Sequence, residues 1–409
     1  MSNILIVGLN FHPEPIGIGK YTGELASYLA ANGHEVHVIT TPPYYPFWKV
    51  QSNYQWWNYK EEIWQNVEIT RCPLWVPGKP TGLKRLCHLL SFALSSIPAL
   101  ISQYSWKPDI VLCIAPSLLN APSSLLFARV SKAKAWLHIQ DFEIAAALNL
   151  GILPSNHLLS IIANKIEIWL MQGFDQISTI SHKMVNLLCQ KGIPLEKTYL
   201  FPNWVDTKVI FPFDENWSFF RKERNIPENK IAVLYSGNIS HKQGLEYFID
   251  AAKLLHNQTQ IHFVICGEGM LRSELEKTAI GYDNIQFLPL EAPENLNLLL
   301  NSADIHILTQ RADAADLVMP SKLSGILASG KPVIATAKPG TELFEIIKKI
   351  GIVVPPENSE ALAQSILDLS RSEEKMHLLG KAGINWVTQY WSSENILGDI
   401  CAKIELHGK

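Results

Sequence analysis

The feature that most constrains the fold is a regular alternation of short apolar runs with longer amphipathic segments. The apolar runs have the length of buried strands, and the segments between them have helical periodicity. This alternation predicts parallel sheets covered by helices on both faces. In the first half, the predicted strands are Ile4–Leu9, Val36–Thr40, Val67–Arg71, Ile110–Ala115, Ala135–Ile139 and Gln176–Ile180. Helices are predicted at Thr22–Asn32, ended by Gly33, and at Leu158–Gln172, ended by Gly173.

The same alternation restarts in the second half, after a proline-containing stretch at 201–228 with little periodicity. The predicted strands are Ile231–Ser236, Ile261–Cys266, Ile285–Leu288, Ile305–Leu308, Pro332–Ala335 and Ile352–Val354. The predicted helices are Gly244–His256, Leu271–Ala279, Ala292–Asn301, Ser321–Ser329, Glu360–Arg371 and Glu394–Leu406. We therefore predict two Rossmann-like, doubly wound α/β domains, 1–204 and 205–388, that face a central cleft. A C-terminal segment, 389–409, is expected to pack back toward the first domain.

Composition excludes several classes of protein. The 409 residues are 47% apolar and 18% charged, which rules out a disordered chain. The net charge of −3 lacks the basic excess of phosphate-backbone binders, so we expect no nucleic acid partner. The six cysteines form no C-x-x-C pair, which argues against zinc ribbons and for reduced thiols. Met1 leads directly into a strand-like run without the features of a signal peptide, so a cytoplasmic location is expected.

A glycine-rich stretch, Gly17-Ile18-Gly19-Lys20-Tyr21-Thr22-Gly23, follows the first predicted strand and opens a helix. Glycines there let backbone amides approach a phosphate or a sugar. The alternative is a plain strand–helix loop that needs glycine for its turn. The third glycine comes one residue too late for the dinucleotide fingerprint, and no carboxylate ends the second strand. Binding of a nicotinamide or flavin cofactor is therefore disfavoured.

Polar side chains end the predicted strand Ala135–Ile139, in the sequence His138-Ile139-Gln140-Asp141-Phe142-Glu143. The carboxyl end of a parallel strand is the ligand side of such a sheet. Asp141 or Glu143 could accept a proton or orient a hydroxyl group. A helix cap by Asp141 and a core position for His138 are the alternatives. For His138 the two interpretations weigh about equally, whereas a functional role is favoured for Asp141.

Two stretches of the second half suit an anionic ligand. The first strand of that half leads into Gly237-Asn238-Ile239-Ser240-His241-Lys242, where a glycine turn and a lysine precede a helix. Further on, Pro320 and Ser321 predict the start of a helix with Lys322 in its first turn. The alternatives are a solvated lysine in the first case, and a helix cap with an exposed lysine in the second. A third glycine motif, Gly267-Glu268-Gly269, is interpreted mostly as a turn.

The stretch 79–106 combines Lys79, Lys84 and Arg85 with many leucines, and Trp75 and Trp106 flank it. A helix of this composition can lie in a membrane interface. The alternative is a core helix with a basic end. Its apolar part, Leu86–Ile101, contains a histidine, serines and a proline, and we expect it to fall short of a membrane-spanning helix.

Taken in order, the motifs resemble the retaining glycosyltransferases of family 4, which have the GT-B fold. The resemblance rests on Gly17-Ile18-Gly19, Gly33-His34-Glu35-Val36, Pro202-Asn203-Trp204-Val205-Asp206, Gly237 with Gly244, Gly267-Glu268-Gly269 and Ala328-Ser329-Gly330-Lys331-Pro332-Val333. It covers nearly the whole chain. Pro42-Pro43-Tyr44-Tyr45-Pro46, Gln140–Glu143, Lys242-Gln243-Gly244 and Pro320-Ser321-Lys322-Leu323 are similar to the exopolysaccharide branch, which includes colanic-acid-type enzymes.

The sequence also departs from the family pattern. Gln140 stands where the family often has histidine, and Asn238 stands in place of the usual arginine. The lysine that normally directly precedes the glycine is one residue early, at Lys242. The family's pair of glutamates would fall near Leu317 and Gly325, and neither is acidic. Since the second glutamate usually contacts the donor ribose, this contact is missing from the pattern.

The resemblance implies sugar transfer from a nucleoside diphosphate donor to a glycan or lipid-linked acceptor, with retention of configuration, in exopolysaccharide or cell-surface polysaccharide synthesis. It implies an N-terminal acceptor-binding domain, a C-terminal donor-binding domain and no metal or cofactor. The expected acceptor or catalytic residues are His138, Asp141 and Glu143. The expected donor or phosphate contacts are Gly17, Gly19, Gly237, Asn238, Lys242, Ser321 and Lys322. An epimerase of GT-B type and a catalytically impaired binding protein are the alternatives. The enzyme is expected in the cytoplasm, at the inner face of the membrane if 79–106 docks there.

Overall fold

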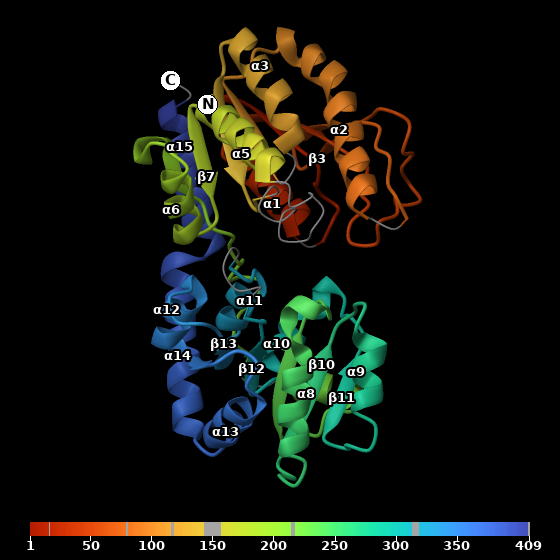
Figure 1. Cartoon of the computed structure of the whole chain (residues 1–409), viewed down its shortest axis with the longest axis vertical. Coiled ribbons are helices and arrows are strands. Elements are labelled where there is room, and N and C mark those ends of the chain that lie inside the picture. The colour runs from red at the N-terminus through yellow and green to blue at the C-terminus, as the bar shows by residue number, and fades with distance from the viewer. Residues whose placement is uncertain are drawn as a thin grey trace. The chain divides into compact units, whose positions relative to one another are not determined.

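The computed structural model describes residues 1–15, 17–78, 81–115, 118–142, 157–213, 217–312 and 319–407. The chain divides into two compact units. Unit 1 comprises Met1–Asn203 and Leu397–Lys409, and unit 2 comprises Trp204–Ile396. Each unit consists of a mainly parallel sheet flanked by helices (Figure 1). Two parallel-sheet domains of the Rossmann type confirm the predicted fold class.

In the described part of unit 1, eight strands form one sheet. Their order is β3 (Lys60–Trp64), β4 (Val67–Arg71), β2 (Glu35–Thr40), β1 (Asn3–Gly8), β5 (Ile110–Ala115), β6 (Lys134–Ile139), β7 (Gln176–Thr179) and β8 (Thr198–Leu200). All neighbouring strands pair in parallel except β3 and β4, which pair antiparallel. The strand order reverses direction between β1 and β5. Such a switch point is where open α/β sheets bind ligands.

The helices of unit 1 cover both faces of this sheet. They are α1 (Gly17–Ala31), α2 (Gly82–Ser102), α3 (Ala121–Ser131), α5 (His157–Gln172) and α6 (His182–Gln190), with short 3-10 turns η1 (Gln103–Ser105), η2 (Leu118–Asn120) and η3 (Leu195–Lys197). The part of α15 (Ser393–His407) from Leu397 onward also belongs to unit 1. Gly33 ends α1 with a φ of +87°, a backbone conformation that glycine adopts without strain.

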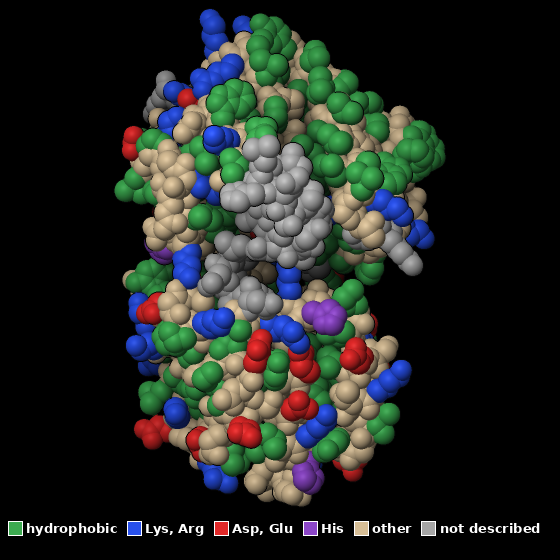
Figure 2. All heavy atoms as spheres, in the orientation of Figure 1, with side chains coloured by type: hydrophobic (Ala, Val, Ile, Leu, Met, Phe, Trp, Pro, Cys, Tyr) green, Lys and Arg blue, Asp and Glu red, His purple; other side chains and the backbone are tan. Residues whose placement is uncertain are grey.

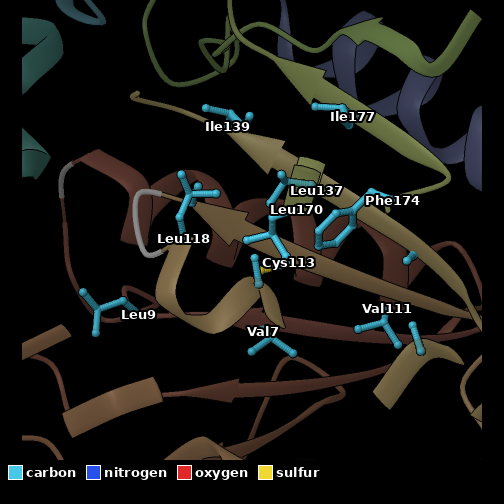
Figure 3. Packing of buried hydrophobic residues seen from close by; sticks show 14 of the residues in the cluster. Val7, Leu9, Val111, Cys113, Leu118, Leu137, Ile139, Leu170, Phe174 and Ile177 are labelled. Carbon is cyan, nitrogen blue, oxygen red and sulfur yellow. The ribbon is translucent and has the colours of Figure 1, made fainter. Parts of the chain in front are cut away.

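Alternate residues of the central strands build the core of unit 1. Three neighbouring strands contribute Val7, Val111 and Leu137 to one face of the sheet. These side chains belong to the same buried cluster as Leu170 of α5 and Phe174, which follows this helix (Figure 3). The strands are buried on both faces, which is why their sequences read as continuous apolar runs without alternation.

In the described part of unit 2, six parallel strands are ordered β11 (Ile285–Leu288), β10 (Ile261–Cys266), β9 (Ile231–Ser236), β12 (Ile305–Leu308), β13 (Val333–Thr336) and β14 (Ile352–Val354). The order reverses between β9 and β12. The helices are α7 (Trp217–Glu223), α8 (Leu245–Leu254), α9 (Arg272–Thr278), α10 (Leu296–Asn301), α11 (Lys322–Ala328), α12 (Glu342–Ile350), α13 (Ser359–Ser370), α14 (Glu373–Tyr390) and the first residues of α15. The 3-10 turns η4 (His241–Gln243) and η5 (Pro293–Asn295) complete the unit.

The structure corrects three local expectations. The first helix begins at Gly17, five residues before the predicted Thr22, so the glycine stretch forms its first turns and is not a loop. The edge strand β3 was not predicted because its exposed, charged residues lack an apolar pattern. Finally, α2 with η1, spanning Gly82–Ser105, is long and apolar enough to cross a membrane by length and composition alone, contrary to the expectation.

Candidate functional site

Unit 2 gathers polar groups at its switch point, where β9 and β12 end. Gly237 directly follows β9, and Lys322 reaches it from the first position of α11. Lys322 Nζ lies 3.4 Å from the carbonyl oxygen of Ser236. A Cβ atom placed on Gly237 would lie 3.7 Å from that ammonium group. Two residues far apart in the sequence, both predicted as donor contacts, are therefore neighbours in the structure.

The aromatic ring of Tyr235 supports the ammonium group of Lys322. Lys322 Nζ lies 3.7 Å from the ring centroid, which is cation–π geometry. The Tyr235 hydroxyl donates to the carbonyl of Asn238 at 2.7 Å and so closes the glycine turn. Burial lowers the pKa of Lys322 to about 7. A lysine in this condition gains from a bound anion, because the anion restores the charged form.

Glycine is required at 267 and 269 by a close backbone approach, whereas position 237 favours glycine through its φ of +134°. Gly237 N donates to the Cys266 carbonyl at 2.9 Å. A Cβ atom on Gly267 would lie only 1.9 Å from the Gly237 carbonyl oxygen, and one on Gly269 would lie 2.1 Å from that of Ile239. Gly267 has a φ of +150°, which also favours glycine. The motif Gly267-Glu268-Gly269 thus holds the Gly237 turn in place, in agreement with its interpretation as a turn.

The loop after Gly237 presents Asn238 and Lys242 to solvent. Both are exposed, and Lys242 lies in the 3-10 turn η4 before α8. The Lys242 carbonyl accepts a hydrogen bond from Arg311 N at 3.0 Å. Arg311 follows β12 on the other side of the switch point and pairs with Glu246 of α8. Sequence reasoning missed Arg311, although its place after a predicted strand was a signal that could have pointed to it.

The N-terminus of α11 differs from the prediction in one respect. Ser321 occupies the N-cap position and is exposed, but its side chain caps no backbone amide. Gly325, at the position where the family pattern has its second glutamate, lies inside this helix, and a Cβ atom there would meet Leu300 at 3.5 Å. Leu317, near the position of the first glutamate, lies outside the described residues.

In unit 1, packing accounts for Gly19. A Cβ atom at Gly19 would lie 2.7 Å from the carboxylate oxygen Oε2 of Glu14. The buried Glu14 carboxylate accepts from the backbone amides of Tyr44 and Tyr45 at 3.0 and 2.9 Å, which ties the loops after β1 and β2 together. Burial raises the pKa of Glu14. Gly17 is exposed at the first position of α1, with a φ of +64°.

The residues predicted at the end of β6 fall in three different settings. His138 is buried within the strand, and its Nδ1 lies 2.9 Å from Ser178 Oγ. Burial lowers the pKa of His138 to about 3, so the imidazole stays neutral. This is the core position that was the alternative for His138. Asp141 is half-buried just beyond the strand. Glu143 lies outside the described residues.

Among the described residues, one group of three side chains could hold a metal ion: His34, Cys401 and Glu405. Cys401 Sγ lies 3.5 Å from His34 Nε2, and Glu405 Oε1 lies 3.9 Å from the same nitrogen. Burial raises the pKa of the Cys401 thiol, so a thiol that donates to the imidazole accounts for the contact. The group joins the turn before β2 to α15 and contains none of the predicted site residues.

Comparison with known proteins defines the class. The family model for a glycosyl transferase 4-like domain matches residues 17–204, and the model for glycosyl transferases group 1 matches residues 218–386. These models describe transferase enzymes that move sugars. The chain belongs to this glycosyltransferase family, which confirms the resemblance seen in the sequence motifs.

A relative and two solved structures illustrate the similarity. WcaI of Escherichia coli (strain K12), named as a colanic acid biosynthesis glycosyl transferase, is 43% identical over 371 residues, covering 89% of this chain and 91% of WcaI. Sucrose-phosphate synthase from Thermosynechococcus elongatus has a TM-score of 0.76 at 17% identity, with 99% of each chain covered. HepE of Anabaena in complex with UDP has a TM-score of 0.71 at 14% identity, with 98% of this chain and 99% of HepE covered. These neighbours share the GT-B fold.

Proposed function

We propose that this glycosyltransferase moves a sugar from a nucleoside diphosphate donor to a glycan or lipid-linked acceptor. The observation that carries the proposal is the ammonium group of Lys322 beside the Gly237 turn, at the switch point of unit 2. A partly buried lysine with a lowered pKa gains most from an anionic ligand. Asn238, Lys242 and Ser321 are included as further donor contacts because they are exposed around the same turn and the start of α11.

The proposed role of these groups is electrostatic. When the bond between the sugar and the diphosphate breaks, negative charge grows on the leaving oxygen. Lys322, already positioned by Tyr235 and Ser236, would stabilise this charge without reorganisation of its surroundings. Lys242, exposed on η4, would add a second positive charge. The proposal includes no metal ion, because the two lysines supply the positive charge.

Unit 1 is proposed to contribute the acceptor-binding groups. Asp141, half-buried at the carboxyl end of β6, would orient an acceptor hydroxyl, and Glu143 is proposed for the same role. Gly17 is kept as an anion contact because it is exposed at the start of α1, whereas Gly19 and His138 are assigned to packing. Retention of configuration is part of the proposal, with no enzyme nucleophile assigned.

The relatives support both the donor class and the biological role. HepE binds UDP in its solved complex, and its chain aligns along nearly the whole of this one. WcaI is named for colanic acid biosynthesis, and we propose synthesis of an extracellular polysaccharide for this chain as well. The named relatives are transferases or synthases, which favours transfer over epimerisation. Nucleotide sugars are cytoplasmic substrates, so we propose activity at the cytoplasmic face of the membrane.

A thermal-shift panel tests the donor site. The full chain is heated with UDP, GDP, ADP, their sugar conjugates and NAD(H). A ligand that binds the native state alone raises the melting temperature according to its concentration relative to Kd. We expect stabilisation by one nucleoside diphosphate family and a smaller shift in Lys242→Ala. The matched control Lys277→Ala changes an exposed lysine in the last turn of α9 and should respond as wild type. Stabilisation by NAD(H) alone would contradict the proposal.

A further inference from the structure

The outward face of α2 is apolar along its whole length. Six leucine or isoleucine side chains spaced three or four residues apart are exposed: Leu83, Leu86, Leu90, Leu94, Ile97 and Ile101. Leu83 is 75% exposed, Leu94 68% and Ile101 66%. At 1.5 Å per residue the row is about 27 Å long. Figure 2 shows hydrophobic side chains gathered over the part of unit 1 where Figure 1 places α2. A helix of a soluble monomer normally turns polar side chains to water.

The opposite face of α2 is held in the protein. His88, Phe92 and Ala99 are buried, and α2 packs beside α3 (Figure 1). His88 Nδ1 lies 2.7 Å from the Trp75 carbonyl, and the Tyr59 hydroxyl donates to the Ser95 carbonyl at 2.8 Å. A helix fixed in this way cannot cross a bilayer without leaving the core of unit 1. Contact of its outer face with a surface would leave the helix in place.

The charges around α2 identify that surface. No Asp, Glu, Lys or Arg occurs between Leu86 and Trp106, and His88 in this range is buried. Lys84 and Arg85 are exposed at one end of this stretch, and Lys107 is exposed at the other. Two exposed aromatic residues, Tyr59 and Trp75, contact α2 directly. An apolar face with positive ends and aromatic neighbours is the pattern of a helix that lies in a membrane interface.

We propose that α2 docks unit 1 in the plane of a bilayer containing anionic lipids, with its leucine face in the acyl boundary and its basic ends at the headgroups. A second copy of the chain fits this face less well. An antiparallel pair of α2 helices would place Lys84 and Arg85 beside Lys107 of the other copy, and a parallel pair would place like ends together. Both arrangements bring positive charges together. Docking in this way would give the enzyme access to a lipid-linked acceptor. Only this statement about the acceptor rests on the proposed function.

Vesicle flotation of the full chain tests the docking. We expect wild type to float with vesicles of phosphatidylcholine and phosphatidylglycerol, and weakly with phosphatidylcholine alone. Leu94→Glu should lower binding more than tenfold, because it places a charge in the acyl boundary. Lys84→Gln with Arg85→Gln should lower binding to anionic vesicles about fivefold for each charge removed. The matched control is Leu378→Glu, an exposed helical leucine of unit 2 that is 58% exposed and should leave flotation unchanged.

The exposed Cys87 on α2 gives a second readout, since the other cysteines are buried or half-buried. An environment-sensitive thiol probe on Cys87 should shift to the blue with anionic vesicles. Equal flotation of wild type and Leu94→Glu, or retention after alkaline extraction as for a spanning helix, would overturn the proposal. So would a lipid-free dimer that Leu94→Glu dissociates, without vesicle binding. Nucleotide binding by Leu94→Glu is measured separately. This measurement distinguishes failure of the membrane proposal from failure of the donor site.

Discussion

Replacing Lys322 by methionine should have opposite effects on ligand binding and on the stability of the free protein. Methionine keeps the length and apolar stem of the side chain but removes the ammonium group beside Gly237. A hydrogen bond to a charged group contributes about 1.5–3 kcal/mol. Loss of this contact should therefore raise Kd for the nucleoside diphosphate by about 10- to 150-fold. Isothermal titration calorimetry at neutral pH measures the change.

The free protein should respond in the other direction. Burial lowers the pKa of Lys322 from the ordinary value of 10.5 to about 7, so the native state binds this proton less well than the unfolded chain. The lysine therefore lowers the free energy of unfolding progressively as pH falls from 10.5 toward 7. Below about pH 7 this decrease stays constant. Lys322→Met should unfold at higher denaturant concentration than wild type at pH 7, and the difference should vanish at high pH. Unchanged nucleotide affinity in a folded variant would refute the site, and lower stability at pH 7 would refute the buried-charge argument.

Three further predictions follow from the contacts in unit 2. Nucleotide affinity should fall as pH rises through about 7, because Lys322 loses its proton there; calorimetric titrations across this range with no change would contradict this. Gly267→Ala should lower the free energy of unfolding, measured in urea, by about 2–4 kcal/mol, because the new methyl group meets the Gly237 carbonyl. Gly281 also has a positive φ, but a Cβ atom there would have no neighbour within 4 Å. Gly281→Ala should therefore lower the free energy of unfolding by only about 1 kcal/mol. Arg221→Met should lower the free energy of unfolding by about 3–5 kcal/mol, because buried Arg221 donates hydrogen bonds to Ser302, Lys230 and Asp304. A decrease of less than about 1 kcal/mol in the same assay would show that these groups find other partners.

The positions of most strands and the class of fold could be predicted because, apart from the pair β3–β4, the strands of both sheets are parallel. Strands buried on both faces give continuous apolar runs, and all six predicted for unit 2 coincide with observed strands to within one residue at either end. The strand β3 lies at an edge, where one antiparallel partner and exposed side chains leave no such run. The early start of α1 could not be predicted from propensity, because glycines disfavour helices. The approach of Glu14 to Gly19, which leaves no room for a Cβ atom, is a tertiary contact that the sequence does not reveal.

The candidate site was predictable only in part. A glycine after a predicted strand identified Gly237, and a predicted helix start identified Lys322, because both positions can be read from the sequence. Their proximity could not be predicted, because Lys322 lies 86 residues after Ser236 in the sequence. The switch point of the sheet brings the two residues together. Tyr235 was read as part of a strand, and its role under the ammonium group depends on side-chain placement. For His138 the sequence left two interpretations, and burial beside Ser178 distinguishes them.

The central claim is sugar transfer from a nucleoside diphosphate donor, and an acceptor-dependent transfer assay tests it most directly. The full chain is incubated with radiolabelled UDP-, GDP- and ADP-sugars and a lipid extract from polysaccharide-producing bacteria. We predict that one donor class releases nucleoside diphosphate only when the extract is present, with an equal amount of label entering the lipid or glycan fraction. Conversion of the donor without any acceptor would instead identify an epimerase. Donor binding without release in the presence of the extract would contradict the claim and identify a binding protein.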